Sequence, residues 1–201
     1  ARDWPRRLGL KRGTRAVSRR TIYLVPLAVF LALAVYFAVG LTKDPQIIPS
    51  ALIDKPVPEF TLPPIEDGQG EPRGGYGKGF SSADLKGNGI SIVNIFASWC
   101  FPCRTEHPFI TRLAEMKVAR VYGLNYKDDP KKALKWLREL GDPYFAIGAD
   151  RKGRVSIDWG VYGVPETFIV DNAGRIRYKH VGPLNAQVLE SIILPTIRKL
   201  G

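Results

Sequence analysis

The stretch ISIVNIFASWCFPCRTEHP, residues 90–108, predicts a buried strand, a turn that carries two cysteines, and a helix that begins at that turn. In the strand, Val93 and Ile95 alternate with Ile92 and Phe96, so both faces are apolar, as in a strand covered on both sides. A helix N-terminus lowers the pKa of a nearby thiol, because its unpaired N–H groups and dipole favour the thiolate. The thiolate attacks a disulfide, and a second cysteine one helical turn later resolves the mixed disulfide. The stretch therefore predicts a site for thiol–disulfide exchange.

Two other roles for a Cys-x-x-Cys pair have to be weighed against exchange. A zinc site needs four ligands, and the chain has only these two cysteines and two histidines, His107 and His180, at no ligand-like spacing from them. A purely structural disulfide over so short a loop gains little chain entropy. Both alternatives stay open on the residues alone, and both are weaker than redox exchange.

Four further blocks follow the WCFPC motif in order: NYKDDP (125–130), ELGDPY (139–144), GVYGVPETFIVD (160–171) and GRIRYKHVGPL (174–184). Together with Pro108, five residues after the second cysteine, they resemble the membrane-anchored thioredoxin-like family of cytochrome c maturation (CcmG/DsbE). The resemblance runs with gaps from about residue 49 to the C-terminus. It implies a thioredoxin fold of the α/β class, a mixed sheet with helices on both faces, preceded by one N-terminal transmembrane helix.

The roles of the cysteines follow from their places around the helix start. Cys100 precedes the helix, so we expect it to be exposed and to be the nucleophile, whereas Cys103 lies in the first turn and is expected to be the buried, resolving thiol. Pro102 lacks an N–H group and pre-shapes the first turn. Trp99 is expected to pack beside the thiol and shield it, or else to belong to the core.

The resemblance also assigns a substrate-binding loop. Val164 and Pro165 match the cis-proline loop that faces the cysteine pair in thioredoxin folds. The backbone before a cis proline is extended and exposed, so it can pair with a substrate strand. Glu166 follows as a residue expected to contribute to substrate fit, with a solvated carboxylate as the alternative. Residues 125–129 and Tyr162 line the groove in the family, and from the sequence alone they are equally well interpreted as turn and surface residues.

Glu106 is the predicted proton-transfer group. Thioredoxins generally carry a buried aspartate six residues before the first cysteine, but here that position is Asn94, which cannot act as a base. Glu106 lies three residues after Cys103, on the same helix face. A carboxylate there raises the pKa of both thiols by charge repulsion and can pass a proton to the buried thiol. The alternative is an ordinary solvated carboxylate.

The charge of the chain is concentrated before an apolar segment. The net charge is +11, and residues 1–20 carry +7 of it, from eight basic residues against Asp3. Residues 22–41 contain no charged side chain and are long enough to cross a bilayer as a helix. The remainder is only mildly basic and shows no basic surface interleaved with aromatics, so a nucleic-acid partner is not supported.

The predicted organisation is a basic cytoplasmic tail (1–21), a transmembrane helix (22–41), a linker (42–54) and a thioredoxin-like domain (55–201). The basic excess before the span predicts a single-pass protein of the inner membrane, with a cytoplasmic N-terminus and a periplasmic domain. A cleaved signal peptide is the alternative, but its apolar core is usually shorter. We therefore expect a retained anchor in contact with the lipid bilayer.

The order of elements in the domain is predicted from periodicity, caps and turns. Strands are expected over 57–62, 119–125, 144–147, 166–171 and 175–181, besides the one before the cysteines, and helices over 80–85, 102–117, 130–140, 155–159 and 186–199. Residues 66–79 are rich in glycine and predict a loop.

The resemblance implies a specific dithiol reductase on the outer side of the membrane. Its expected partners are apocytochrome c or a maturation thiol protein as substrate, and a membrane thiol-reductant transporter as electron donor. No bound cofactor or metal is expected, since the Cys100–Cys103 disulfide is itself the redox group. The alternatives are a general periplasmic oxidant or isomerase, and a non-catalytic binding subunit.

Overall fold

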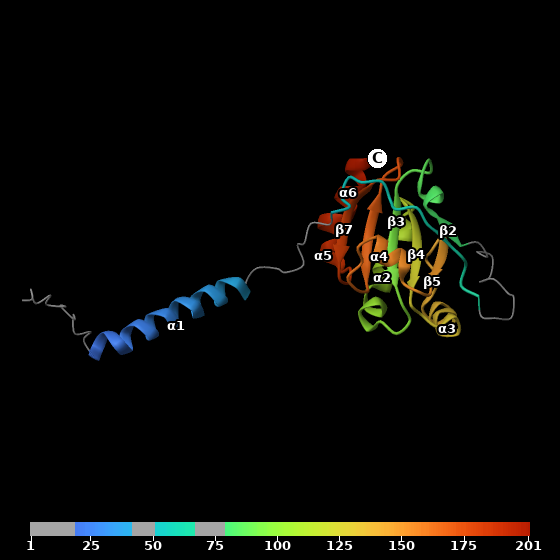
Figure 1. Ribbon diagram of the computed structural model, residues 1–201. Helices are drawn as coiled ribbons and strands as arrows, with labels where there is room; N and C mark the ends of the chain where they lie inside the picture. Colours follow the sequence, from blue (N-terminus) through green and yellow to red (C-terminus); the bar gives the residue numbers. More distant parts are fainter. Residues whose placement is uncertain (1–18, 42–50, 67–78) are drawn as a thin grey trace, which may run out of the picture. The chain divides into compact units, whose positions relative to one another are not determined.

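The computed structural model describes residues 19–41, 51–66 and 79–201 (Figure 1). The predicted tail up to residue 18, most of the linker, and most of the glycine-rich loop lie outside these residues. The chain divides into two units, residues 1–47 and 48–201. The first contains one long helix, α1 (Arg19–Leu41). Its segment Tyr23–Gly40 is apolar enough to cross a membrane, with a mean hydropathy of 2.2, as the sequence predicts.

A mixed five-stranded sheet forms the centre of the second unit, in the order β5-β4-β3-β6-β7 (Figure 1). The strands are β3 (Ser91–Phe96), β4 (Arg120–Tyr126), β5 (Ala146–Asp150), β6 (Glu166–Val170) and β7 (Ile176–Val181). The central strand β3 runs parallel to β4 and antiparallel to β6. All six residues of β3 are buried, which confirms the predicted strand covered on two faces.

Helices cover both faces of this sheet, so the predicted thioredoxin-like fold class is confirmed. On one face lie α2 (Phe101–Met116), α3 (Pro130–Leu140) and a C-terminal helical segment. That segment consists of α5 (Ala186–Val188), a π-helical turn (Leu189–Ile193) and α6 (Leu194–Leu200). On the other face lie α4 (Arg154–Asp158), the 3₁₀ helix η1 (Ser82–Leu85) and a small hairpin of β1 (Thr61–Leu62) and β2 (Phe80–Ser81). The predicted first strand is thus confirmed only over its last two residues.

Local signals fix the starts of the two helices nearest the cysteines. Cys100 is the N-cap of α2, which has Pro102 in its first turn. Asp129 caps α3, since its side chain accepts a hydrogen bond from the backbone N–H of Lys132 at 3.0 Å. Helix α3 ends at Gly141, whose φ of 94° suits a residue without a Cβ.

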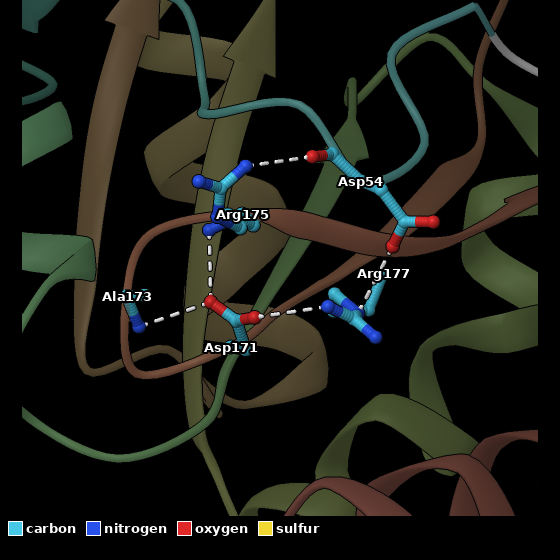
Figure 2. Close-up of polar contacts among 5 residues, drawn as sticks. All are labelled: Asp54, Asp171, Ala173, Arg175 and Arg177. Atoms are coloured by element: carbon cyan, nitrogen blue, oxygen red, sulfur yellow. Dashed lines mark hydrogen bonds and ion pairs between the residues drawn. The ribbon is translucent and has the colours of Figure 1, made fainter.

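The segment before the first strand is tied to the hairpin between β6 and β7 (Figure 2). Asp54 accepts a hydrogen bond at its carbonyl from the Arg175 guanidinium at 2.9 Å, and its carboxylate lies 3.2 Å from Arg177 Nε. The backbone N–H of Asp54 donates to the carbonyl of Ile176 at 2.7 Å. Asp54, which the sequence assigns to the linker, is therefore attached to the domain. Because β6 ends beside the start of β3, this attachment lies at the end of the sheet opposite the cysteine pair.

Candidate functional site

The cysteine pair lies at the junction of β3 and α2 and forms a disulfide. The sulfur of Cys100 accepts a hydrogen bond from the backbone N–H of Cys103 at 3.1 Å. An N–H donor at a helix N-terminus stabilises negative charge on this sulfur once the pair is reduced. The prediction that Cys100 is exposed is wrong for the disulfide form. Cys100 is 4% and Cys103 1% exposed, because both pack into the apolar cluster between the sheet and α2.

Trp99 lies at the surface beside the disulfide, with 58% of its area exposed, so it does not belong to the core. Its indole N–H donates to the carbonyl of Lys127 at 3.2 Å. The neighbouring Asp128 carboxylate accepts hydrogen bonds from the backbone N–H and the hydroxyl of Ser98, at 2.6 and 2.7 Å. Residues 125–129 therefore hold the segment that leads into the disulfide, while a contact with substrate stays a prediction.

The Val164–Pro165 peptide bond is cis. Glu166, the next residue, pairs with Ile95 of β3, so the bond lies at the end of the sheet where the disulfide follows β3. Pro165 is buried and its carbonyl accepts a hydrogen bond from the backbone N–H of Gly182 at 3.0 Å. The loop thus lies at the same end of the sheet as the sulfurs, and its predicted contact with an extended peptide stays a prediction.

Glu106 is buried, with 1% of its area exposed, which excludes the solvated carboxylate. Its Oε1 accepts a hydrogen bond from Asn94 Nδ2 at 2.8 Å, and its Oε2 accepts one from the backbone N–H of Leu184 at 2.9 Å. The Asn94 amide is held in turn: the Tyr144 hydroxyl donates to its Oδ1 at 2.8 Å, and its Nδ2 lies 3.2 Å from Thr167 Oγ1. Asn94 therefore supports Glu106 from the position where thioredoxins carry an aspartate.

Burial raises the pKa of Glu106 from 4.5 to about 7, even though the hydrogen bonds from Leu184 and Asn94 lower it. Among the described residues, no ion pair involves this carboxylate. Its charge is thus stabilised only by neutral donors. A carboxyl group that titrates near neutral pH is suited to both accepting and returning a proton.

Glu166 is also buried, with 0% of its side chain exposed, but its partners differ. Its Oε2 lies 3.0 Å from the ammonium nitrogen of Lys179, and its Oε1 accepts a hydrogen bond from the backbone N–H of Tyr162 at 2.9 Å. Its carboxylate therefore does not lie at the surface. Any contribution of Glu166 to substrate fit, which stays a prediction, is indirect through the loop that it holds.

The described residues contain no group of three or more His, Cys, Asp or Glu side chains that could hold a metal ion. His107, one of the two histidines, is buried in the core, where its ring packs edge-on against Trp136 with centroids 4.5 Å apart. Desolvation lowers the pKa of His107, although a hydrogen bond to the carbonyl of Gly141 opposes this. This environment suits a packed core side chain rather than a metal ligand that acts together with the cysteines.

Comparison with known proteins fits this site. The Redoxin family matches residues 53–193. The thiol:disulfide interchange protein DsbE of Pseudomonas aeruginosa is 44% identical over 182 residues, which cover 90% of this chain and 96% of that protein. The chain belongs to the DsbE family. The DsbE protein of Escherichia coli K12 is 42% identical over 187 residues, with 90% and 96% coverage.

Solved structures place this DsbE-family chain in the same group. A structure described as a thiol:disulfide interchange protein DsbE from Chlorobium tepidum has a TM-score of 0.56 and 28% identity, and covers 71% of this chain and 95% of that one. The family and the cysteine pair make the chain a thiol–disulfide oxidoreductase.

The sequence does not reveal three residues that shape the site. Lys179 lies in a strand of alternating polar and apolar residues, and its burial depends on Gly160 in a loop and on Glu166 in β6. Tyr144 reaches Asn94 from a position fifty residues away. Asp128 belongs to the NYKDDP block, but nothing in that block indicates that its carboxylate binds Ser98.

Proposed function

We propose that this chain is a membrane-anchored periplasmic dithiol reductase of cytochrome c maturation, which keeps the haem-attachment cysteines of apocytochrome c reduced. It would act on the Cys-x-x-Cys-His segment directly or through a partner thiol protein. The observation that carries the proposal is the arrangement on α2, where Cys100 is the N-cap and a buried carboxyl group with a pKa of about 7 lies one turn after Cys103. The identity to DsbE proteins supports the same assignment.

The chemistry follows from these residues. In the reduced protein the Cys100 thiolate attacks one sulfur of a substrate disulfide, forms a mixed disulfide, and releases the other substrate sulfur as a thiolate. Glu106 takes the proton of the Cys103 thiol, and the Cys103 thiolate then attacks the Cys100 sulfur. The substrate leaves as a dithiol with its second sulfur as the leaving group, and the protein keeps the Cys100–Cys103 disulfide. The two electrons are restored by a membrane thiol-reductant transporter.

The location follows from charge and hydropathy. The basic residues before the apolar span favour a cytoplasmic N-terminus, and the domain would then lie in the oxidising periplasm. A reductant there has to discriminate among disulfides, since reducing the structural disulfides of other proteins would be harmful. An anchor would restrict where the domain acts, and contacts with the substrate beyond the cysteine pair would supply the rest of this discrimination.

Trapping of mixed disulfides in cells tests the proposal. Cys103→Ala leaves Cys100 unable to release its partner, so the partner accumulates as a covalent adduct. We expect apocytochrome c or one dedicated maturation thiol protein to dominate the adducts, and the Cys100→Ala, Cys103→Ala double variant to give none.

Two results would replace the proposal by its alternatives. Adducts with many unrelated periplasmic proteins would indicate a general oxidant or isomerase, and so would a reduction potential well above that of thioredoxin. Cytochrome c maturation that survives in the double variant would indicate a binding subunit.

A further inference from the structure

Lys179 has a buried side chain that contacts the loop of residues 160–164 and strand β6. Its side chain is 3% exposed, although it projects from the last strand of the sheet. Its ammonium group donates to the carbonyl of Gly160 at 2.7 Å, pairs with Glu166 at 3.0 Å, and lies 4.1 Å from the ring centroid of Tyr162. Lysine is almost never fully buried unless it is paired, so this arrangement is a built polar centre rather than a surface charge.

Lys179 and Glu166 together hold the backbone of residues 160–164. Lys179 binds the carbonyl at the start of this loop, and Glu166 binds the backbone N–H of Tyr162 at 2.9 Å. The Tyr162 ring covers the ammonium group as in a cation–π contact and yet remains 66% exposed. The buried side chains of Lys179 and Glu166 thus fix the loop, while the Tyr162 ring stays accessible to solvent.

The held loop leads directly into the cis Val164–Pro165 bond, at the end of the sheet that carries the disulfide. Two other exposed aromatic residues, Trp99 (58%) and Phe101 (75%), flank Cys100 in the sequence. Aromatic rings that are exposed beside a cis-proline loop offer apolar contact area to an extended peptide. Tyr162 is the member of this set whose position depends on a buried charge.

We propose that Lys179 is a positioning residue for peptide substrates: it fixes the 160–164 loop and the Tyr162 ring as a preformed contact surface at the end of the sheet that carries the disulfide. The inference rests on the proposed function only in that the substrate is a peptide. Preformed surfaces raise affinity because less conformational freedom is lost on binding. Lys179 has no contact with either sulfur among its described contacts, so it acts on peptide binding and not on the exchange chemistry itself.

The test compares a peptide with a small disulfide as substrates of the reduced full chain in detergent. The peptide contains an oxidised Cys-x-x-Cys-His segment. The small substrate is an aromatic disulfide that is too short to contact both the cysteine pair and the 160–164 loop. The main variant is Lys179→Met with Glu166→Gln, which removes both charges and leaves neither buried alone. Lys179→Arg keeps the pair, and Lys199→Met removes an exposed lysine as a control.

We expect the double variant to lose about tenfold in kcat/KM for the peptide, through KM, with the small disulfide and the reduction potential of the cysteine pair little changed. The single variant Lys179→Arg, which keeps the ion pair, should retain most of the wild-type activity with the peptide. Equal losses with both substrates, or unchanged peptide KM despite a lower melting temperature, would overturn the proposal and leave Lys179 a purely structural residue.

A second variant covers the case in which the double variant does not fold. Tyr162→Ala removes an exposed ring and should reproduce the selective loss with the peptide; an unchanged peptide KM in this variant overturns the proposal too. Failure of the proposed function has a different signature. If the wild-type chain does not prefer a Cys-x-x-Cys-His peptide over unrelated peptide disulfides, the cytochrome assignment fails, while the peptide-to-small-disulfide ratio still reports on Lys179.

Discussion

Two buried glutamates lie at the same end of the sheet and on opposite faces of it. Asn94, the partner of Glu106, pairs in register with Thr167, and the next pair is Ile95 with Glu166. Since successive residues of a strand point to opposite faces, Glu106 joins the face of α2 and Glu166 the face of α4. Both are almost inaccessible, with exposures of 1% and 0%.

The difference between them is the charge of their partners. Glu106 meets only neutral donors, an amide side chain and a backbone N–H, so its ionised form remains costly and the group titrates near neutral pH. Glu166 meets the ammonium group of Lys179 and holds a loop. Equal burial therefore gives a group suited to proton transfer in one case and a structural ion pair in the other.

Breaking the ion pair gives the largest expected effect. Glu166→Ala leaves the Lys179 ammonium group buried without its carboxylate, and we expect a loss of about 3–5 kcal/mol in the free energy of unfolding, measured by urea denaturation. The Lys179→Met, Glu166→Gln double variant should lose much less, because neither charge is left alone. A loss below about 1 kcal/mol for Glu166→Ala would contradict a structural role for the buried Glu166–Lys179 ion pair, since exposed ion pairs contribute that little.

The pH dependence of stability isolates Glu106. Its pKa is about 7 in the folded chain and 4.5 ordinarily, so between these values the folded state keeps a proton that the unfolded state has released. Stability from this group is therefore complete below pH 4.5, falls as pH rises to 7, and is constant above. The loss across this window is about 3 kcal/mol.

Glu106→Gln should remove this slope, so the variant is expected to be more stable than the wild type above pH 7. The lowered pKa of His107 and of His180 changes stability in the opposite direction as pH falls. Because both proteins contain both histidines, this contribution cancels in the difference between the two stability curves. Glu115→Gln, at an exposed position of the same helix, serves as the control. Parallel curves for wild type and Glu106→Gln would contradict a buried, unpaired carboxylate.

Local signals in the sequence predict much of this fold. The central strand is confirmed in its place before the cysteine turn, and α3 has the predicted bounds, because Asp129, Pro130 and Gly141 mark its two ends. The first strand is shorter than predicted, since its extent depends on β2, which lies beyond the glycine-rich loop. Asp54 is wrongly assigned to the linker because its partners lie in a hairpin more than a hundred residues away.

The site is predicted in its residues and less well in their environment. Spacing brings Cys100, Cys103 and Glu106 together on one helix start, and the resemblance supplies the proline loop. Burial is a property of the assembled fold, so neither the low exposure of Cys100 nor the ion pair of Glu166 has a local signal. The roles assigned to these residues remain predictions for experiment.

Exchange kinetics test the role of Glu106 in the reaction itself. Removing the carboxylate charge with Glu106→Gln should lower the apparent pKa of Cys100 and slow disulfide exchange by about a hundredfold, because the proton acceptor for Cys103 is lost. The pH profile of thiol alkylation gives the first quantity and stopped-flow mixing with a peptide disulfide the second. An unchanged alkylation profile would remove Glu106 from the mechanism, whatever its effect on stability.

The smallest expected effect comes from Tyr144→Phe, which deletes the hydroxyl that donates to Asn94 Oδ1. The ring stays stacked on Phe96, with centroids 4.9 Å apart, so the loss should be about 1–2 kcal/mol in unfolding free energy, the usual value for one buried acceptor left without its donor.

The same variant, Tyr144→Phe, also tests how the Glu106 carboxyl group is held. If the hydroxyl fixes the amide so that Nδ2 faces Glu106, a loosened amide weakens that hydrogen bond and the carboxyl pKa rises. The upper end of the pH-dependent loss of stability should then move above pH 7. If stability falls but this upper end does not move, Asn94 keeps its orientation without Tyr144.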